Sequence, residues 1–264
     1  MKLPVITVRA APSPESEWVR FADVAMDHAL ALGDEVTVPG IRGVIGDEPE
    51  TRSHAATAIV TGVATADAIE ELLSLYDAQQ AAWPRLLQPD AGGLAGLLRE
   101  RGFRPREARL LRLRAAAVPH ADAGDVLVVP GRAARGPIDA WAQARSTDEP
   151  AAALWPRHLD DPQYEAIVAL RNGRAVAAAG LQTRGQTGLL IDLFVNADER
   201  LRGLGTLLAN RATELAARSQ LADVFATTSG DDEAGPRLME RVGFATVREF
   251  VEWHPPLTRR PAGP

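Results

Sequence analysis

Short apolar runs separated by glycine-containing turns dominate the second half of the chain and predict strands. The dipeptide Asn172-Gly173, typical of a two-residue hairpin turn, separates two of these runs. Leucines at helical spacing after Gly203 predict an amphipathic helix. The expected strands are 164–170, 175–181, 188–195, 223–228 and 246–253, and the expected helices are 138–144, 203–219 and one that is capped by Ser229 or Asp231 and ends at Val242. Hairpins followed by strand–helix–strand–helix–strand predict a mixed α/β domain built on one sheet.

Two pairs of segments resemble each other and suggest an internal duplication. Residues 97–103 and 238–244 each read as the end of an amphipathic helix followed by Gly-Phe, which suits a left-handed C-terminal cap. Residues 5–8 and 126–129 are apolar strand-like runs, each followed by a polar loop and a helical stretch with a tryptophan. The alternative is two unrelated α/β stretches that share a helix stop.

The distance in sequence from the strand-like run to the Gly-Phe pair measures the length of each copy. Val8 and Phe103 are 95 positions apart, whereas Val129 and Phe244 are 115 apart, so the second copy is longer by 20 residues. Residues 115–124 are rich in Ala, Pro, Gly and Asp without periodicity, which is typical of a linker. We therefore expect two domains, 1–118 and 125–264.

Composition and charge narrow the classes of function. The 264 residues are 46% hydrophobic, as in a globular protein. The absence of cysteine excludes disulfides, thiolate metal sites and a cysteine nucleophile. A net charge of -6 argues against nucleic acid as a partner, because nucleic-acid binders usually carry a basic surplus. We expect no metal cofactor.

Hydropathy argues against a membrane protein. No run reaches the roughly 18 to 20 apolar residues that a membrane helix needs. The apolar run at the N-terminus is too short for a signal peptide. We expect a cytoplasmic protein with no membrane partner, present as a monomer or a homodimer.

The segment Arg200-Leu201-Arg202-Gly203-Leu204-Gly205-Thr206 is the sharpest indication of a binding site. It joins an apolar strand to an amphipathic helix, where consecutive backbone N–H groups and the helix dipole favour an anion. The Rossmann fingerprint fails because Leu208 stands where a third small residue is needed, and no Gly-Lys-Ser/Thr of a P-loop occurs. A tight glycine turn entering a helix is the alternative.

In its context this segment resembles the pyrophosphate loop of the GNAT acetyltransferase superfamily. That loop reads Arg/Gln-x-x-Gly-x-Gly/Ala after a strand, and Arg200, Gly203 and Gly205 match it. The strand residues 192–195 and the closing helix with Gly-Phe at 238–244 also resemble family members. The resemblance covers about residues 126–253.

The resemblance implies two GNAT-like domains, each a mixed, mostly antiparallel sheet flanked by helices, and an acetyl-CoA-dependent N-acetyltransferase. Amides of residues 200–206 would hold the pyrophosphate, and the backbone of Leu193, Phe194 and Val195 would pair with the pantetheine arm between two splayed strands. A primary amine of a small molecule or peptide would attack the thioester directly in a ternary complex. A backbone N–H near Val195 would polarise the carbonyl.

The chain departs from the family pattern in the last helix. The usual acid there is a tyrosine, and Met239, which cannot donate a proton, occupies its position. Asp232 and Gly235 replace the usual Asn and Ala. This departure keeps open a second function, a non-catalytic acyl-CoA-binding or assembly module.

Other side chains are candidates for the proton transfer. Asp192 is the candidate base, although a carboxylate bonded to backbone at a strand end explains it equally well. His158 and Tyr164 lie near the expected acceptor groove, and surface or packing roles compete for both.

The first half lacks an equivalent loop. Residues 41–46 look superficially similar, but the acidic, Pro-containing residues 47–50 follow, and we interpret 41–46 as a hairpin turn. The 20 missing residues are expected where the loop and its helix would be. We therefore expect a degenerate first copy that shapes the acceptor pocket through a shared interface including Trp83, Pro84 and residues 94–103.

Overall fold

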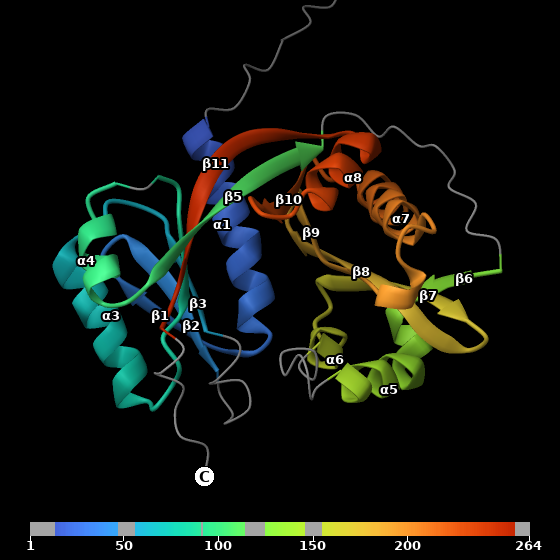
Figure 1. Cartoon of the computed structure of the whole chain (residues 1–264), viewed down its shortest axis with the longest axis horizontal. Helices are drawn as coiled ribbons and strands as arrows, with labels where there is room; N and C mark the ends of the chain where they lie inside the picture. The colour runs from blue at the N-terminus through green and yellow to red at the C-terminus, as the bar shows by residue number, and fades with distance from the viewer. Residues whose placement is uncertain (1–13, 47–55, 91, 114–124, 146–154, 257–264) are drawn as a thin grey trace, which may run out of the picture.

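One continuous 11-stranded sheet runs through the part of the chain that the computed structural model describes, residues 14–46, 56–90, 92–113, 125–145 and 155–256. Its order is β1-β2-β3-β4-β11-β5-β10-β9-β8-β7-β6 (Figure 1). The first half of the chain supplies β1 (Gly33–Val38), β2 (Ile41–Gly46), β3 (Thr57–Val60), β4 (Arg85–Gln88) and β5 (Arg104–Leu113). The second half supplies β6 (Leu127–Pro130), β7 (Tyr164–Arg171), β8 (Arg174–Arg184), β9 (Thr187–Val195), β10 (Asp223–Ser229) and β11 (Phe244–His254).

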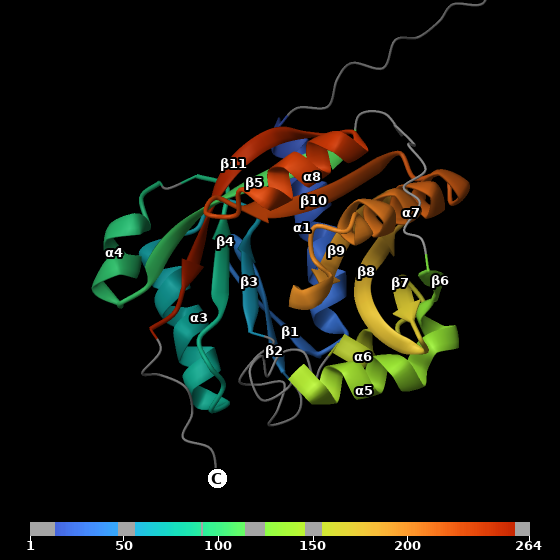
Figure 2. The same ribbon diagram turned by 45° about the vertical axis from the view of Figure 1, so that its right-hand side comes forward.

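The strand order is symmetric about the antiparallel pair β5 and β11 except for β6, which has no counterpart among the described residues of the first half. Each of these strands crosses into the other half: β5 lies between β11 and β10, and β11 lies between β4 and β5 (Figure 2). Pairing directions agree on both sides, since β3 runs parallel to β4 as β9 does to β10. The two halves thus share one sheet through exchanged strands.

Helices cover both faces of this sheet. One face carries α3 (Ala66–Ala78) and α4 (Ala95–Glu100) over the first half, and α7 (Leu204–Arg218) and α8 (Ala234–Val242) over the second. The opposite face carries α1 (Pro14–Leu30), α5 (Arg135–Arg145) and the short α6 (Trp155–His158). Among the described residues, no helix is long and apolar enough to cross a membrane.

Helix α1 packs against both halves of the sheet (Figure 1). The indole N–H of Trp18 donates to the carbonyl oxygen of Val60 in the first half at 2.7 Å. Phe21 meets Phe225 of β10 edge to face, with ring centroids 6.4 Å apart. A shared apolar cluster therefore holds α1 at the junction of the halves.

Ion pairs hold the same helix on the second half. Arg112 of β5 contacts Glu17 of α1 and Asp223 of β10, each at 2.7 Å. Near the end of α1, Asp27 pairs with Arg184 of β8 at 2.5 Å. These contacts direct the last turn of α1 towards β8 and β9.

The periodicities predicted most elements of the second half correctly. The hairpin at Asn172-Gly173, the five strands from β7 to β11 and helices α5, α7 and α8 all form. The mixed α/β fold is confirmed. The expected strand at residues 5–8 and the expected linker at residues 115–124 both lie outside the described residues.

Three expectations are wrong. Residues 41–46 form β2, paired on both sides, and the turn lies one step earlier, at Gly40 with φ 78°. Neither Ser229 nor Asp231 caps α8; the Asp232 carboxylate accepts the N–H groups of Ala234 and Gly235, while Asp231 pairs with Arg106.

The third error concerns the extra length of the second half. The helix that we expected to be missing from the first half is present. Helix α3 follows β3 in the same way that α7 follows β9. Only part of the extra length lies at the loop, which β9 enters with 9 residues against 4 in β3. The second half is also longer in its hairpin, where β7 and β8 have 8 and 11 residues against 6 each in β1 and β2. It also contains α6, which lies between α5 and β7.

The exchanged strand β11 gives a test of this architecture. Trp253 is fully buried among first-half residues, and its indole N–H donates to Gln88 of β4 at 3.0 Å. We expect Trp253→Ala to lower the free energy of unfolding by about 3–5 kcal/mol, measured by urea denaturation. Val63→Ser, at a side chain 89% exposed, is the matched control and should change it by less than about 0.5 kcal/mol. A loss under about 1 kcal/mol for Trp253→Ala would contradict the integration of β11 into the first half.

Candidate functional site

Strands β9 and β10 pair along only part of their length. Their parallel pairing runs from Thr187 and Asp223 to Leu190 and Ala226, and beyond it residues 191–195 pair with none of the described residues on the β10 side. On the other side of β9, Phe194 and Val195 still pair with β8. The backbone of Leu193 to Val195 therefore presents an open strand edge in a gap within the sheet.

A β-bulge lies at the start of this open edge. Ile191 pairs with Gly180 and Phe194 with Ala178, so Asp192 and Leu193 together oppose one residue of β8. Asp192 has a φ of 56°, a left-handed conformation that is uncommon for a non-glycine residue. Such strain persists where surrounding contacts enforce it, often at functional sites. The bulge turns the Asp192 side chain towards α1 and α6.

The glycine loop leads from β9 into α7. Leu201 and Gly203 both have left-handed φ angles, 62° and 80°. Gly203 is the N-cap of α7, no side chain caps this helix, and its first turn holds no acidic residue. The N–H of Leu207 bonds to the carbonyl of Gly203, so the amides of residues 204–206 begin the helix without an intrahelical acceptor. This end of α7 is suited to an anion.

The glycine loop is exposed to solvent, and ion pairs and close packing at its two ends hold it in place. Arg200 to Gly203 are exposed, and a Cβ added at Gly203 would meet nothing within 4 Å. Glu199 is buried and pairs with Arg171 and with Arg202, at 3.1 Å for the latter. At Gly205 an added Cβ would lie 2.7 Å from Leu238 of α8, so glycine allows α7 and α8 to pack closely.

Asp192 belongs to a cluster built from both halves of the chain. Tyr164 of β7 donates its hydroxyl hydrogen to Oδ2 of Asp192 at 2.8 Å. The same oxygen lies 3.6 Å from Nε2 of His28, in the last turn of α1. The His28 ring stacks on His158 of α6, with centroids 4.0 Å apart and planes 10° apart. Four polar side chains from four elements thus meet beside the open edge of β9.

Burial sets the protonation of two members. The side chain of Tyr164 is fully buried, and this burial, together with the Asp192 charge, raises the pKa of its hydroxyl well above the usual value. Tyr164 therefore stays protonated and donates to Asp192. Burial, and then the nearby His28, lowers the pKa of His158 from 6.5 to about 4, so His158 is neutral at physiological pH.

The sheet provides the space for this tyrosine. Gly180 of β8 pairs with Ala166, two residues along β7 from Tyr164, and a Cβ added there would lie 2.2 Å from the Tyr164 hydroxyl oxygen. A side chain at Gly180 would push the hydroxyl off Asp192. Glycine at this position therefore keeps the hydrogen bond in place.

The ligand atoms of His28, His158 and Asp192 lie within 4.8 Å of one another, close enough together for a metal ion. The two imidazole planes are nearly parallel and 4.0 Å apart at their centroids, so their nitrogen lone pairs lie in two stacked planes rather than meeting at one centre. A tetrahedral ion would require one ring to rotate out of the stack. The observed geometry suits proton transfer better than metal binding.

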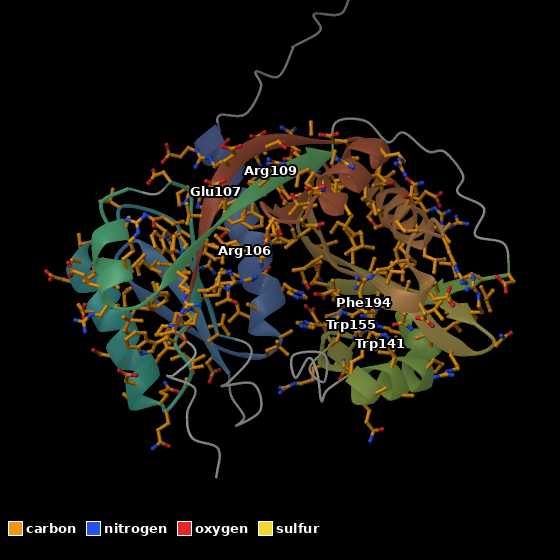
Figure 3. All side chains as sticks on the ribbon, viewed as in Figure 1. Arg106, Glu107, Arg109, Trp141, Trp155 and Phe194 are labelled. Carbon is orange, nitrogen blue, oxygen red and sulfur yellow. The ribbon has the colours of Figure 1, made fainter. Side chains whose placement is uncertain are left out.

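Aromatic side chains support the open edge from the helical side. Phe194 packs edge to face on Trp141 of α5, which in turn meets Trp155 of α6 (Figure 3). The guanidinium of Arg145 lies 3.6 Å from the centroid of the Phe194 ring. The indole N–H of Trp141 donates to Asn196 at 3.1 Å. These contacts and the pairing with β8 hold the end of β9 in position without a partner on its β10 side.

The structure groups the residues that the sequence singled out into two adjacent sets. Leu193 to Val195 and the loop 200–206 form one continuous surface along the end of β9 and the start of α7. Asp192, Tyr164 and His158 form the second set with His28. Sequence reasoning missed His28, and only its place on the apolar face of α1, in line with Phe21 and Val24, could have indicated that it is turned inward.

Comparison with known proteins supports part of this interpretation. The model of the acetyltransferase (GNAT) family matches residues 135–244, which span α5 to the start of β11 and include the glycine loop. The GNAT resemblance of the second half is therefore confirmed. No curated protein matches the chain.

Solved structures share the fold over nearly the whole chain. A GCN5-related N-acetyltransferase from Kribbella flavida has a TM-score of 0.67 at 20% identity and covers 90% of this chain and 95% of its own. A functionally unknown conserved protein from Staphylococcus epidermidis has a TM-score of 0.62 at 18% identity, with 84% and 93% covered. A tandem GNAT protein from the clavulanic acid biosynthesis pathway has a TM-score of 0.54 at 16% identity, with 93% and 88% covered. At these identities the likeness concerns the fold.

The lowered pKa of His158 predicts a specific loss of stability in acid. With a pKa of about 4 when folded and 6.5 when unfolded, the unfolded chain binds more protons between these values. Stability contributed by neutral His158 is therefore present above about pH 6.5 and falls as the pH drops towards 4, by up to about 3 kcal/mol. Urea denaturation measures the free energy of unfolding at pH values from about 7.5 down to about 4.5. Over this range the free energy of unfolding should fall less for His158→Phe than for the native chain. The same dependence on pH in both proteins would contradict a neutral, buried His158.

Proposed function

We propose that this protein is an acetyl-CoA-dependent N-acetyltransferase whose active site lies in the second half of the chain. The observation that carries the proposal is the open edge of β9 leading directly into the uncapped, glycine-rich start of α7. An extended amide-bearing arm and a pyrophosphate are the two parts of coenzyme A that such a surface fits. The GNAT match over residues 135–244 and the shared fold support the assignment.

The cosubstrate would be held mainly by the backbone. The amides of residues 204–206 and the exposed Arg200 would bind the pyrophosphate, with Arg202 partly neutralised by Glu199. The pantetheine arm would pair with Leu193 and Val195 as an added strand, which satisfies backbone groups that β10 leaves free. An N–H at this edge of β9 would polarise the thioester carbonyl.

Acetyl transfer then requires a base for the amine and a proton source for the leaving thiolate. Asp192 lies at the bulge that begins the open edge, and its side chain is 24% exposed, so an amine can reach it. Tyr164 would orient its carboxylate by donating to Oδ2. The amine nitrogen would attack the thioester carbon, the carbon–sulfur bond would break, and the thiolate would take the proton that the new amide nitrogen releases.

The first half is proposed to be a degenerate copy that binds no coenzyme A. Helix α3, the counterpart of α7, is capped by the Thr65 hydroxyl, which accepts the Ala68 N–H at 3.2 Å. Its first turn also contains Asp67, whose charge opposes a phosphate. In α7 the corresponding positions hold no cap and no acid. The strand symmetry about β5 and β11 favours duplication as the origin of the two halves.

A buried methionine motivates the second candidate function, a non-catalytic acyl-CoA-binding module. Met239 of α8 is 5% exposed and packs in the core that α7 and α8 share, and its side chain has no proton to donate. The polar cluster around Asp192 favours the enzyme, because a binding module needs no such group. The acceptor is proposed as a primary amine of a small molecule or peptide, and the compartment as the cytoplasm.

Coenzyme A binding can be tested at the loop. Gly203→Glu places a carboxylate beside the proposed pyrophosphate position, so we expect it to abolish the rise in melting temperature that coenzyme A gives the native chain. Gly185→Glu is the matched control, since Gly185 also has a positive φ and open space around its Cβ position. An unchanged coenzyme A response in Gly203→Glu would remove the proposed site.

Catalysis is tested separately by thiol release from acetyl-CoA with a broad panel of primary amines. We expect turnover with at least one amine and a loss of about 10²–10⁴-fold in kcat for Asp192→Asn, the range for removing a general base. Coenzyme A binding without turnover on any amine would favour the non-catalytic module instead.

A further inference from the structure

The cluster around Asp192 contains a group that the acetyltransferase assignment does not use. His28 comes from the first half of the chain and lies at the C-terminal end of α1, 3.6 Å from the Asp192 carboxylate. Its side chain is 12% exposed, between the more accessible Asp192 at 24% and the buried His158. From solvent inwards, the three side chains therefore follow the order Asp192, His28, His158.

A carboxylate alone is a poorly matched base for an amine. Carboxylic acids have ordinary pKa values near 4, whereas alkylammonium ions lose their proton near about 10. An imidazole titrates close to neutral pH, so it holds the proton long enough for the free amine to attack. A histidine in contact with the carboxylate reduces this mismatch.

Groups of negative charge surround the His28 ring. It lies in the last turn of a 17-residue helix, where the backbone carbonyls carry the negative end of the helix dipole. Asp192 faces its Nε2, and the neutral His158 ring lies flat against it. Its Nδ1 is buried and has no hydrogen-bond partner in the part of the chain that the structure describes, so we assign the proton exchange to Nε2, the nitrogen that faces Asp192.

On the basis of the proposed acetyltransferase function, we propose that His28 accepts the proton of the amine substrate across the Asp192 carboxylate, which makes the active site a joint product of both halves. The ammonium gives one proton to Asp192, which passes it to Nε2 of His28. The neutral amine then attacks the thioester, the thiolate leaves with the bonding electron pair, and the amide nitrogen gives its second proton to that thiolate. The imidazolium finally releases its proton to water, so the cycle balances.

The charges around His28 are compatible with this role. Besides the cluster itself, charged or titratable groups come from α1, the α6 region and β8, namely Asp27, Arg157, Asp161 and Arg184. Asp27 is paired with Arg184, and Asp161 accepts a hydrogen bond from Gln182. Asp192 is therefore the carboxylate that exchanges a proton with His28.

The roles of the two histidines differ, and substitutions can separate them. His158 is stacked, buried and neutral, so His158→Phe preserves a flat ring beside His28 and should keep kcat within about tenfold. His28→Gln keeps a polar side chain of similar length but no base, and we expect kcat to fall about 10²–10⁴-fold. His254→Gln, on β11 away from the cluster, is the matched control and should leave kcat unchanged.

The test measures thiol release with the best amine of the panel across the pH range, together with the coenzyme A melting shift of each variant. In His28→Gln we expect a normal melting shift, an unchanged KM for acetyl-CoA and loss of the acidic limb of the kcat profile. Added imidazole should restore part of the kcat of His28→Ala, which a purely structural role would not allow.

Several results would overturn the proposal. A His28→Gln variant with kcat within threefold of the native value and the same pH profile would remove His28 from the reaction. Activity lost on chelation and restored by Zn²⁺ would make the cluster a metal site instead. If the native chain binds coenzyme A but acetylates no amine, the acetyltransferase function fails, and the role of His28 fails with it. If Asp192→Asn is inactive while His28→Gln is fully active, only the present proposal fails.

Discussion

The antiparallel pairing of β5 with β11 joins the two halves of the chain, and the contacts between them follow from it. Each strand takes a place in the sheet of the other half, so neither half completes its own sheet. Helix α1 can therefore lie across the junction, held by Trp18 on one side and by the Arg112 ion pairs on the other. This arrangement carries His28 to Asp192 from 164 positions away in the sequence.

The second half combines rigid support with unsatisfied backbone. Strand β9 parts from β10 after Leu190, but aromatic packing on Phe194 and pairing with β8 keep it extended. The free strand edge and the uncapped start of α7 are groups that ordinary folding would satisfy internally. The first half satisfies the equivalent helix start with Thr65. This difference within one fold is the physical basis for assigning coenzyme A to the second half.

Local patterns predicted the elements and the glycine loop because their information is local. Helical spacing defined α7, Asn172-Gly173 defined a hairpin, and Gly203 with Gly205 marked the helix entry. The exchange of β5 and β11 could not be predicted, since strand pairing over more than a hundred residues leaves no local pattern. Residues 41–46 illustrate the limit: a glycine suggested a turn, yet pairing with β1 and β3 makes it a strand. For the same reason the sequence revealed Asp192 but not its partner His28.

The central claim is that one chain holds one working acyl-CoA site, built on the second half and completed by the first. Calorimetric titration of the purified chain with coenzyme A measures this stoichiometry directly. We expect one molecule of coenzyme A to bind per chain. Two molecules per chain would contradict the degenerate first half, and no binding would contradict the site itself.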